Sequence, residues 1–221
     1  MLLSLRLQRA YEFLEPELVL ADVGCDHAFL AIEAVLRSKI TKAYAIDNKK
    51  EPLKRAEQNI RFAGLENQVF PLLNDGLENL PKDVRQLSIC GLGGGLIASI
   101  LDHEKIKQIQ VLVLGTNKDA LLIRKKLEEL KFQIIDEDIV YEDGVFYELI
   151  KAIPGESRLD ERELYFGPIL RKTKSKVFVS KWKKYLDYLE KIYSKVPEKH
   201  QEKRFSLAQE IQLIEEEIND L

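Results

Sequence analysis

Val19–Leu30, with the sequence VLADVGCDHAFL, is the stretch that decides the fold. An apolar run ends at Val23, Gly24 follows it, and apolar residues return from Leu30 onward at the spacing of a helix. Glycine accepts backbone angles that other residues avoid, so a strand can turn sharply into a helix at Gly24. The first turn of that helix presents backbone N–H groups to a ligand. The stretch therefore predicts a buried strand, a ligand-binding turn and a helix.

The residues that follow repeat this alternation of strand and helix. A short amphipathic helix over 2–14 precedes the first strand. We expect strands at 18–23, 42–47, 68–73, 86–90 and 110–115, and helices at 28–38, 50–63, 96–103 and 118–130. Pro71 indicates that the third strand lies at an edge or a bulge. The turn Glu142-Asp143-Gly144 then joins two more strands, at 132–140 and 145–153, as a hairpin.

This order of elements predicts an α/β fold with a parallel sheet covered by helices on both faces. A closing antiparallel hairpin is the layout of class I methyltransferases. The first turn lacks the GxGxxG pattern of nicotinamide-dependent dehydrogenases, which argues against that class. We therefore expect a Rossmann-like methyltransferase domain over residues 1–155.

The character of the sequence changes after Pro154-Gly155. Residues 158–193 and 198–219 combine mixed charge with spaced apolar residues, and Pro197 separates them. We expect residues 156–221 to form a helical or coiled-coil appendage.

Bulk composition narrows the class of protein further. The chain has 221 residues, a formal net charge of −3 and two cysteines, Cys25 and Cys90, which suggest neither a disulfide framework nor a metal site. No stretch is apolar and long enough to span a membrane, and charges interrupt the N-terminal segment where a signal peptide would be apolar. We expect a cytoplasmic protein without a metal. A Ser-His-Asp order and a Gly-Lys-Ser/Thr loop are also missing, so hydrolysis has little support.

Polar residues and glycines follow the carboxyl ends of four expected strands, where ligands bind in such sheets. Asp22 and Asp26 flank Gly24, and two carboxylates suit a cationic ligand such as S-adenosylmethionine better than a phosphate. Asp47 is placed to accept hydrogen bonds from ribose hydroxyls, and Asp75 to accept one from an adenine amino group. Asp47 and Asp75 each have a simpler interpretation, a helix cap for Asp47 and a plain turn for Asp75. However, the polar residues all follow strand ends that one parallel sheet would bring to the same edge. The predicted cofactor-binding residues are Asp22, Gly24, Cys25, Asp26, His27, Asp47, Asn48, Asn74, Asp75, Gly76 and Gly91.

Several motifs in order resemble the bacterial TrmK family of tRNA (adenine(22)-N1)-methyltransferases. They cover nearly the whole chain and read LADVGCDHAFL, AIDNKKEP, NDGL, ICGLGGGLI, EDGVFYE and ELYFGPIL. The resemblance implies a class I methyltransferase fold, S-adenosylmethionine as donor, tRNA as substrate and a C-terminal coiled coil. Two loops depart from the family pattern. Leu92 stands in place of methionine in the glycine-rich loop, and Gly115-Thr116-Asn117 stands in place of Gln-Pro-Asn.

For the reaction itself we expect adenine N1 to attack the methyl group as a lone-pair nucleophile. Asp26 is a candidate to stabilise the positive charge of the methylated base. Asn117 could hold the base through its amide, although it could equally be a helix cap. Gly93 and Gly94 would let the backbone approach the base closely.

A basic stretch, Arg171–Lys184, holds seven basic residues and no acidic one, which points weakly to a polyanionic partner. Phe178 and Trp182 lie within it and could add contacts to RNA. The predicted tRNA-binding residues are Arg6, Gly93, Gly94, Lys172, Lys174, Lys176, Lys181 and Lys183. A solvated helix face is the simpler interpretation of the basic stretch. A small-molecule methyltransferase and a non-catalytic RNA-binding scaffold remain as alternative functions, and we expect a monomer or a weak homodimer.

Overall fold

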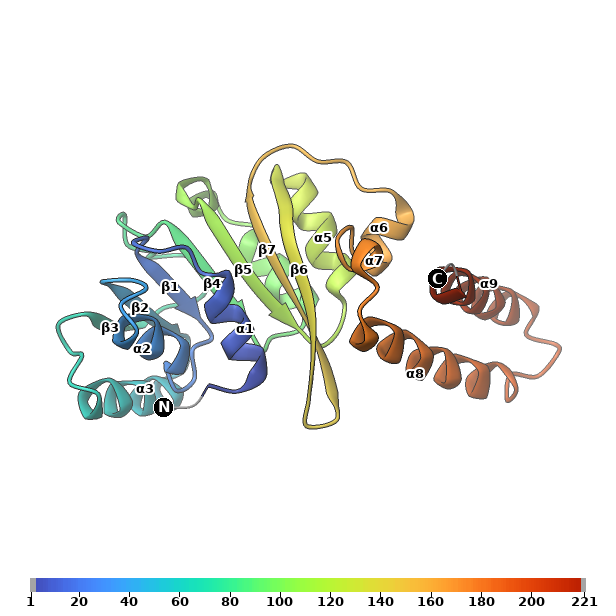
Figure 1. The fold of residues 1–221 in the computed structure, drawn as a ribbon, viewed down its shortest axis with the longest axis horizontal. Helices are drawn as coiled ribbons and strands as arrows, with labels where there is room; N and C mark the ends of the chain where they lie inside the picture. Colours follow the sequence, from blue (N-terminus) through green and yellow to red (C-terminus); the bar gives the residue numbers. More distant parts are fainter. Residues whose placement is uncertain (1–2, 220–221) are drawn as a thin grey trace. The chain divides into compact units, whose positions relative to one another are not determined.

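The computed structural model describes residues 3–219 and contains a seven-stranded sheet in the order β3-β2-β1-β4-β5-β7-β6 (Figure 1). Neighbouring strands from β3 to β5 are parallel, and β7 is antiparallel to both β5 and β6. The predicted parallel sheet with a closing hairpin is therefore confirmed, with Pro71 on the edge strand β3. The strands are β1 (Leu20–Val23), β2 (Ala43–Asp47), β3 (Val69–Leu73), β4 (Gln86–Cys90), β5 (Val111–Thr116), β6 (Phe132–Glu142) and β7 (Val145–Pro154).

Helices cover both faces of the sheet and enclose two hydrophobic cores. Side chains of α1, α2 and α3 pack with Val111 and Val113 in one core, and side chains of α4 and α5 pack with Leu112 and Leu114 in the other. Successive residues of a strand point to opposite faces, so residues 111–114 of β5 must all be apolar to serve both cores. The helices are α1 (Leu5–Phe13), α2 (Phe29–Leu36), α3 (Lys50–Phe62), α4 (Gly94–Leu101) and α5 (Ala120–Glu129), with a 3-10 turn at Glu104–Gln108.

The order of strands reverses beside β1. The chain runs outward from β1 to β2 and β3, then returns to place β4 on the other side of β1 and continues to β5. The loops after β1 and β4 therefore leave the sheet in opposite directions and open a crevice between them.

The hairpin of β6 and β7 closes through Asp143 and Gly144, which both have positive φ, 50° and 81°. This is the pattern of a type I′ turn, whose twist matches that of the strands. The hairpin extends past the end of the sheet at which the parallel strands end (Figure 1).

The prediction of a single helix over 158–193 is wrong, because the structure has three helices in this range. The helix α6 (Glu161–Phe166) starts at a capping box of Asp160 and Glu163 and ends at Gly167, where φ is +96°. A short helix α7 (Leu170–Thr173) follows, and Ser175 caps the start of α8 (Lys176–Tyr193) with its side chain. The last helix, α9 (Gln201–Asn219), agrees with expectation.

The chain divides into two compact units after Ile169, whereas the sequence placed the boundary after residue 155. We call the second of these, from Leu170 onward, the helical unit. The parts of the predicted N-terminal helix and domains that fall on residues 1, 2, 220 and 221 lie outside the described residues. Across residues 3–219, no helix has the length and hydrophobicity needed to cross a membrane.

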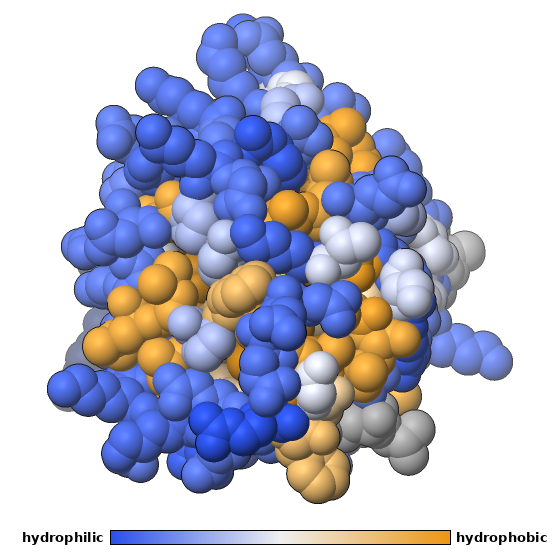
Figure 2. All heavy atoms as spheres, turned by 90° about the vertical axis from the view of Figure 1, so that its left-hand side faces the viewer, coloured by the Kyte–Doolittle hydropathy of each residue, from blue (hydrophilic) through white to orange (hydrophobic). Residues whose placement is uncertain are grey.

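Figure 2 shows the side of the molecule on which α3 and the edge strand β3 lie. Hydrophilic residues cover most of it, and hydrophobic residues show between them as separate patches. The edge strand β3 contains Pro71, which has no backbone N–H, and this disfavours pairing with another sheet.

The loop before α4 is locked against the loop before α5. The Gly94 N–H donates to the Lys118 carbonyl at 3.1 Å. A Cβ at Gly94 would lie 2.6 Å from the carbonyl carbon of Asp119 and closer still to its oxygen. Only glycine leaves room for this approach of two backbones.

We expect Gly94→Ala to destabilise the protein by about 1–3 kcal/mol, since the backbone of Asp119 must move to make room. Gly95→Ala is the matched control, because its Cβ would meet only Leu122 Cδ1 at an ordinary 3.6 Å. Thermal unfolding measures both variants. Equal melting temperatures for the two would contradict the interpretation.

Candidate cofactor site

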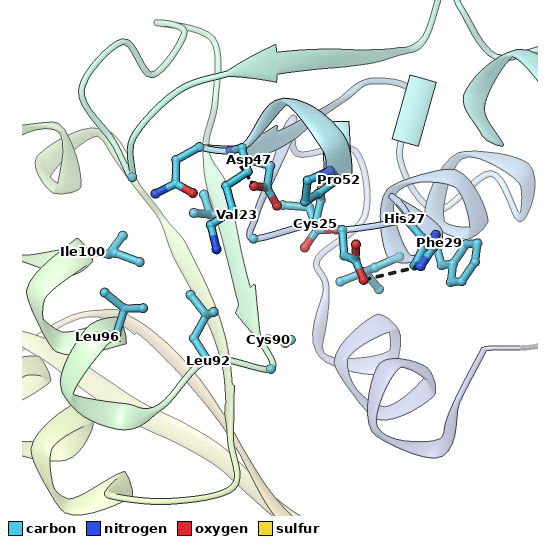
Figure 3. A pocket seen from close by; sticks show the side chains of 18 of the residues that line it. Val23, Cys25, His27, Phe29, Asp47, Pro52, Cys90, Leu92, Leu96 and Ile100 are labelled. Atoms are coloured by element: carbon cyan, nitrogen blue, oxygen red, sulfur yellow. Dashed lines mark hydrogen bonds and ion pairs between the residues drawn. The ribbon is translucent and has the colours of Figure 1, made fainter. Parts of the chain in front are cut away.

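A cavity of about 700 Å³ lies at the carboxyl ends of β1 to β4, where the strand order reverses (Figure 3). It is of the size that holds a small molecule or cofactor. Every residue predicted to bind the cofactor lines this cavity, and so does Arg6. The predicted residues are Asp22, Gly24, Cys25, Asp26, His27, Asp47, Asn48, Asn74, Asp75, Gly76 and Gly91.

The turn after β1 has an unusual backbone. Gly24, Asp26 and Ala28 all have positive φ, at 72°, 45° and 57°. The N–H groups of Gly24 and Cys25 both donate to the Ile46 carbonyl at the end of β2, at 2.9 Å and 3.1 Å. Left-handed conformations at two non-glycine residues cost free energy and are typical of functional turns.

Asp26 is an exposed carboxylate between the Arg55 guanidinium and the His27 imidazole. Its Oδ1 accepts from Arg55 Nη2 at 3.0 Å, and its Oδ2 lies 3.4 Å from His27 Nε2. The His27 ring in turn stacks on Phe29, with 5.0 Å between ring centroids. Asp26 therefore lies at an exposed point of the cavity lining, held by contacts from α3 and from its own turn.

The turns after β2 and β3 contact each other. Asn48 Nδ2 donates to Asp75 Oδ1 at 3.3 Å, while Asp47 Oδ1 accepts the Lys49 N–H at 2.9 Å. The Asn74 side chain is buried and serves the turn itself, donating to the Gly76 carbonyl and accepting from Asn79. We therefore expect Asn74 to shape the cavity rather than to recognise a ligand with its amide.

Asp22 is a buried carboxylate at the floor of the cavity, with 5% of its surface exposed. Burial raises the pKa of Asp22 to about 7, although a hydrogen bond with Ser88 opposes the shift. A group with this pKa carries part of a negative charge at neutral pH, and a bound cation would draw it fully to the charged form.

Both cysteine thiols also meet the cavity. Burial raises the pKa of Cys25 well above its usual range and raises the pKa of Cys90 to about 12. The nucleophilic form of cysteine is the thiolate, so neither residue is activated for covalent catalysis.

An apolar wall faces the carboxylates across the cavity. It consists of Leu92, Leu96 and Ile100, which are labelled together on one side in Figure 3. Sequence reasoning used the glycines of this segment and missed these three residues. Leu96 and Ile100 lie four residues apart on one face of α4, and Leu92 lies in the loop just before it; this spacing is the signal that could have found them.

The predicted base-binding residues Asn117, Gly93 and Gly94 do not line the cavity. Asn117 is exposed, and Gly94 is in contact with the loop that carries Asn117. Thr116 lies where the family pattern has proline. Its hydroxyl is buried, donates to the Lys118 carbonyl at 2.7 Å and accepts the Lys118 N–H at 3.3 Å, so a side chain holds this turn in place of a rigid ring.

Arg6 reaches the cavity from α1. Its Nη1 lies 3.3 Å from the point where a Cβ at Gly91 would be, and its guanidinium stands 5.1 Å above the Tyr147 ring centroid. Its Nε is 3.7 Å from Glu142 Oε2 at the tip of the hairpin. The hairpin therefore holds a cation beside the glycine-rich loop.

In the helical unit, the predicted tRNA contacts divide into exposed and half-buried residues. Lys172, Lys176 and Lys183 are exposed, and Lys174 and Lys181 are half-buried. Phe178 and Trp182 are buried, so the idea that they contact RNA is wrong. With Leu189 they form the apolar face of α8.

Among residues 3–219, no three histidine, cysteine or acidic side chains are placed to hold a metal ion.

Comparison with known proteins identifies relatives that match over nearly all of the chain. A family model described as TrmK, tRNA (adenine(22)-N(1))-methyltransferase, matches residues 20–216. The chain is 34% identical over 231 residues to the Bacillus subtilis tRNA (adenine(22)-N(1))-methyltransferase, which covers 98% of this chain and 97% of the relative.

Solved structures agree with this match. A Streptococcus pneumoniae protein in complex with S-adenosyl-L-methionine is 34% identical, has a TM-score of 0.91 and covers 98% of this chain and 100% of its own. M. capricolum TrmK in complex with S-adenosyl-homocysteine is 28% identical, has a TM-score of 0.90 and covers 99% of each chain. The predicted fold class, with its C-terminal helical appendage, is confirmed.

The buried carboxyl of Asp22 predicts a pH dependence with opposite signs for stability and for binding. Its pKa in the folded protein is raised, so its protonated form stabilises the fold below about pH 4, and this contribution is lost as pH rises through about 7. Because this loss builds up between about pH 4 and pH 7, Asp22→Asn should raise the melting temperature of the ligand-free protein relative to the unchanged protein much more at pH 8 than at pH 5.

A cationic ligand requires the charged carboxylate, so its affinity should rise with pH through about 7 and its binding should release protons. Calorimetry in two buffers of different ionisation heat measures that release. Asp102→Asn, an exposed carboxylate outside the cavity, is the control. Equal proton release by Asp22→Asn and by the unchanged protein would contradict the assignment.

Proposed function

Because this chain belongs to the TrmK family of tRNA (adenine(22)-N(1))-methyltransferases, we propose that the cavity at the strand ends binds S-adenosylmethionine and that the basic stretch of the helical unit binds tRNA. The protein is a methyltransferase that transfers a methyl group from S-adenosylmethionine to N1 of an adenine in tRNA. The small-molecule and scaffold alternatives are set aside by the family match, which covers both the catalytic fold and the appendage.

The observation that carries the cofactor assignment is the convergence of all the predicted residues on one cavity with a buried carboxylate at its floor. The cavity fits the chemistry of the cofactor in three respects. Asp22 offers negative charge to a cationic ligand, Asp47 and Asp75 offer acceptors for ribose and adenine groups, and the wall of Leu92, Leu96 and Ile100 suits an apolar surface.

The bound cofactor supplies an electrophilic methyl group. The protein has to place the target adenine in line with it, and positioning of this kind supplies much of the rate enhancement in bimolecular transfers. Adenine N1 has its own lone pair, so the reaction needs no strong base. A base inside folded RNA must be rotated out of its stack to reach the cavity, at a cost of a few kcal/mol.

We assign to Asp26 the stabilisation of the positive charge that the base acquires on methylation. Its carboxylate stands at the cavity mouth, and Arg55 and His27 hold it in place. Asn117 and the loop of Gly93 and Gly94 are proposed to contact the base from outside the cavity. Arg6 is proposed to contact the tRNA, since it brings positive charge to the glycine-rich loop.

The basic stretch is proposed to contact the tRNA backbone through Lys172, Lys174, Lys176, Lys181 and Lys183. Lys176 and Lys183 lie seven residues apart on α8 and so share its exposed face, opposite Phe178 and Trp182. Phosphate contacts of this kind provide affinity that falls with salt.

We further propose that the protein acts as a monomer or weak homodimer, without a metal, in the cytoplasm. Its free cysteines suit a reducing compartment. Light scattering across a range of protein concentrations measures the oligomeric state.

The cofactor assignment is tested with labelled S-adenosylmethionine, unmodified tRNA and nucleoside analysis. Asp47→Ala should raise KM for the cofactor by about 10- to 100-fold, since a hydrogen bond to a charged group contributes about 1.5–3 kcal/mol. The product should remain 1-methyladenosine. Asp102→Ala outside the cavity is the control, and an unchanged KM in Asp47→Ala would remove the proposed role.

The tRNA assignment predicts a change in salt dependence. Replacement of both Lys176 and Lys183 by Gln should weaken tRNA binding and lower the slope of log affinity against log salt by about two, one for each lysine. Cofactor affinity should not change. Lys203→Gln on α9, an exposed lysine outside the basic stretch, is the control. If the double variant keeps the full slope, the basic stretch is a solvated helix face.

A further inference from the structure

A buried ion cluster lies away from the cavity. Arg124 on α5 has no exposed surface, and it meets Glu137 on β6 and Glu148 on β7. Arg124 Nε donates to Glu137 Oε1 at 2.9 Å, and Nη2 contacts both carboxylates. None of the three residues lines the cofactor cavity.

The cluster also holds the segment that follows β7. Arg124 Nη1 lies 3.3 Å from the Leu164 carbonyl oxygen and 3.4 Å from that of Tyr165, and donates to both. Glu137 Oε2 accepts the Ile169 N–H at 2.9 Å. The arginine and one glutamate therefore hold the segment 164–169 on both sides of Gly167.

Gly167 packs directly on the charged groups. Its φ is +96°, and a Cβ there would lie 2.7 Å from both Arg124 Nη2 and Glu137 Oε2. The chain passes over the cluster with no room for a side chain. Gly167 belongs to ELYFGPIL, a motif that neither the cofactor site nor the basic stretch uses.

Stability alone does not account for such a cluster. Removal of charges from water costs free energy, and well-packed apolar residues of similar volume often stabilise a fold as well or better. Charged groups add geometric specificity, because the planar guanidinium of arginine forms good hydrogen bonds with only a few arrangements of its partners. Here the partners include two backbone carbonyls five and six residues before Leu170, where the helical unit begins.

We propose that the cluster of Arg124, Glu137 and Glu148 is a positioning device for tRNA, which fixes the point and direction at which the chain leaves the methyltransferase unit. The inference rests on the proposed contact between the basic stretch and tRNA. When the segment 164–169 is held, the chain that leads to the basic stretch leaves the cavity-bearing unit from a fixed point. The tRNA bound by the basic stretch is then tethered at that point. A loose segment would leave the cofactor site intact and reduce the productive encounters of the two substrates.

The test is Gly167→Ala, with Gly64→Ala as the matched control. Gly64 also has positive φ, +69°, but a Cβ there meets nothing within 4 Å, so the control measures backbone strain without the clash. We expect Gly167→Ala to lower kcat/KM for tRNA by about tenfold or more, as misplacement of a reactant does. The dissociation constant of S-adenosylmethionine should stay unchanged. Amide exchange at 163–170 should accelerate, while exchange in β1 and β4 should not.

A purely structural role would lower the melting temperature and leave kcat/KM for tRNA at the value of the Gly64→Ala control. That result, with faster exchange at 163–170, would overturn the proposal. If Gly167→Ala does not fold, Arg124→Lys gives the same readouts, because an ammonium keeps the charge but cannot span two carboxylates and two carbonyls.

A double-mutant cycle separates this inference from the proposed role of the basic stretch. The lysine pair Lys176 and Lys183 is replaced by Gln in the unchanged protein and in Gly167→Ala. If the cluster acts through the basic stretch, the lysine changes should lower kcat/KM for tRNA by a smaller factor in Gly167→Ala than in the unchanged protein. Full additivity would overturn the inference and leave the lysine contact standing. No effect of the lysine changes in either background would overturn the proposed contact itself.

Discussion

The pairing of β1 with both β2 and β4 is the constraint on which the site depends. All four residues of β1 are buried, and each pairs in parallel register with residues of both neighbours. Parallel strands end at the same edge of a sheet, so this pairing brings the turns after β1, β2 and β4 together. Asp22 is placed at the floor of the cavity because the register places Asp22 beside Ala45 and Ser88, inside the sheet.

Charge is distributed unevenly for a protein whose substrate is a polyanion. The cavity carries Asp22, Asp26, Asp47 and Asp75, which suits a cationic cofactor but would repel phosphate. An RNA partner has to gain its affinity elsewhere, and the basic stretch of the helical unit is the region of the chain with the composition for it. Under the proposed function, the carboxylates of the cavity would serve the cationic cofactor, and the basic stretch together with Arg6 would serve tRNA.

Two features show how the tertiary structure compensates for local sequence. Thr116 replaces a proline of the family pattern, and its hydroxyl holds the turn by two hydrogen bonds to Lys118. The same Lys118 carbonyl accepts the Gly94 N–H, so the two loops beside the cavity are held by one peptide group. The contact between the two loops uses only backbone atoms, whereas the turn at Thr116 depends on its side-chain hydroxyl.

The amino-acid sequence by itself determined the succession of strands and helices along the chain, the closing hairpin and a set of residues that line one cavity. These features follow from local rules. The spacing of hydrophobic residues identifies each strand, and the parallel arrangement brings the carboxyl ends of the strands to the same edge of the sheet. The tertiary structure alone decided the rest. The apolar wall of Leu92, Leu96 and Ile100, the burial of Phe178 and Trp182 and the break of the C-terminal helix at Gly167 depend on what packs against each segment. The ion cluster joins Arg124, Glu137 and Glu148 with a segment up to 45 residues further along the chain than Arg124, and no spacing in the sequence predicts a contact formed only when three elements and that segment meet.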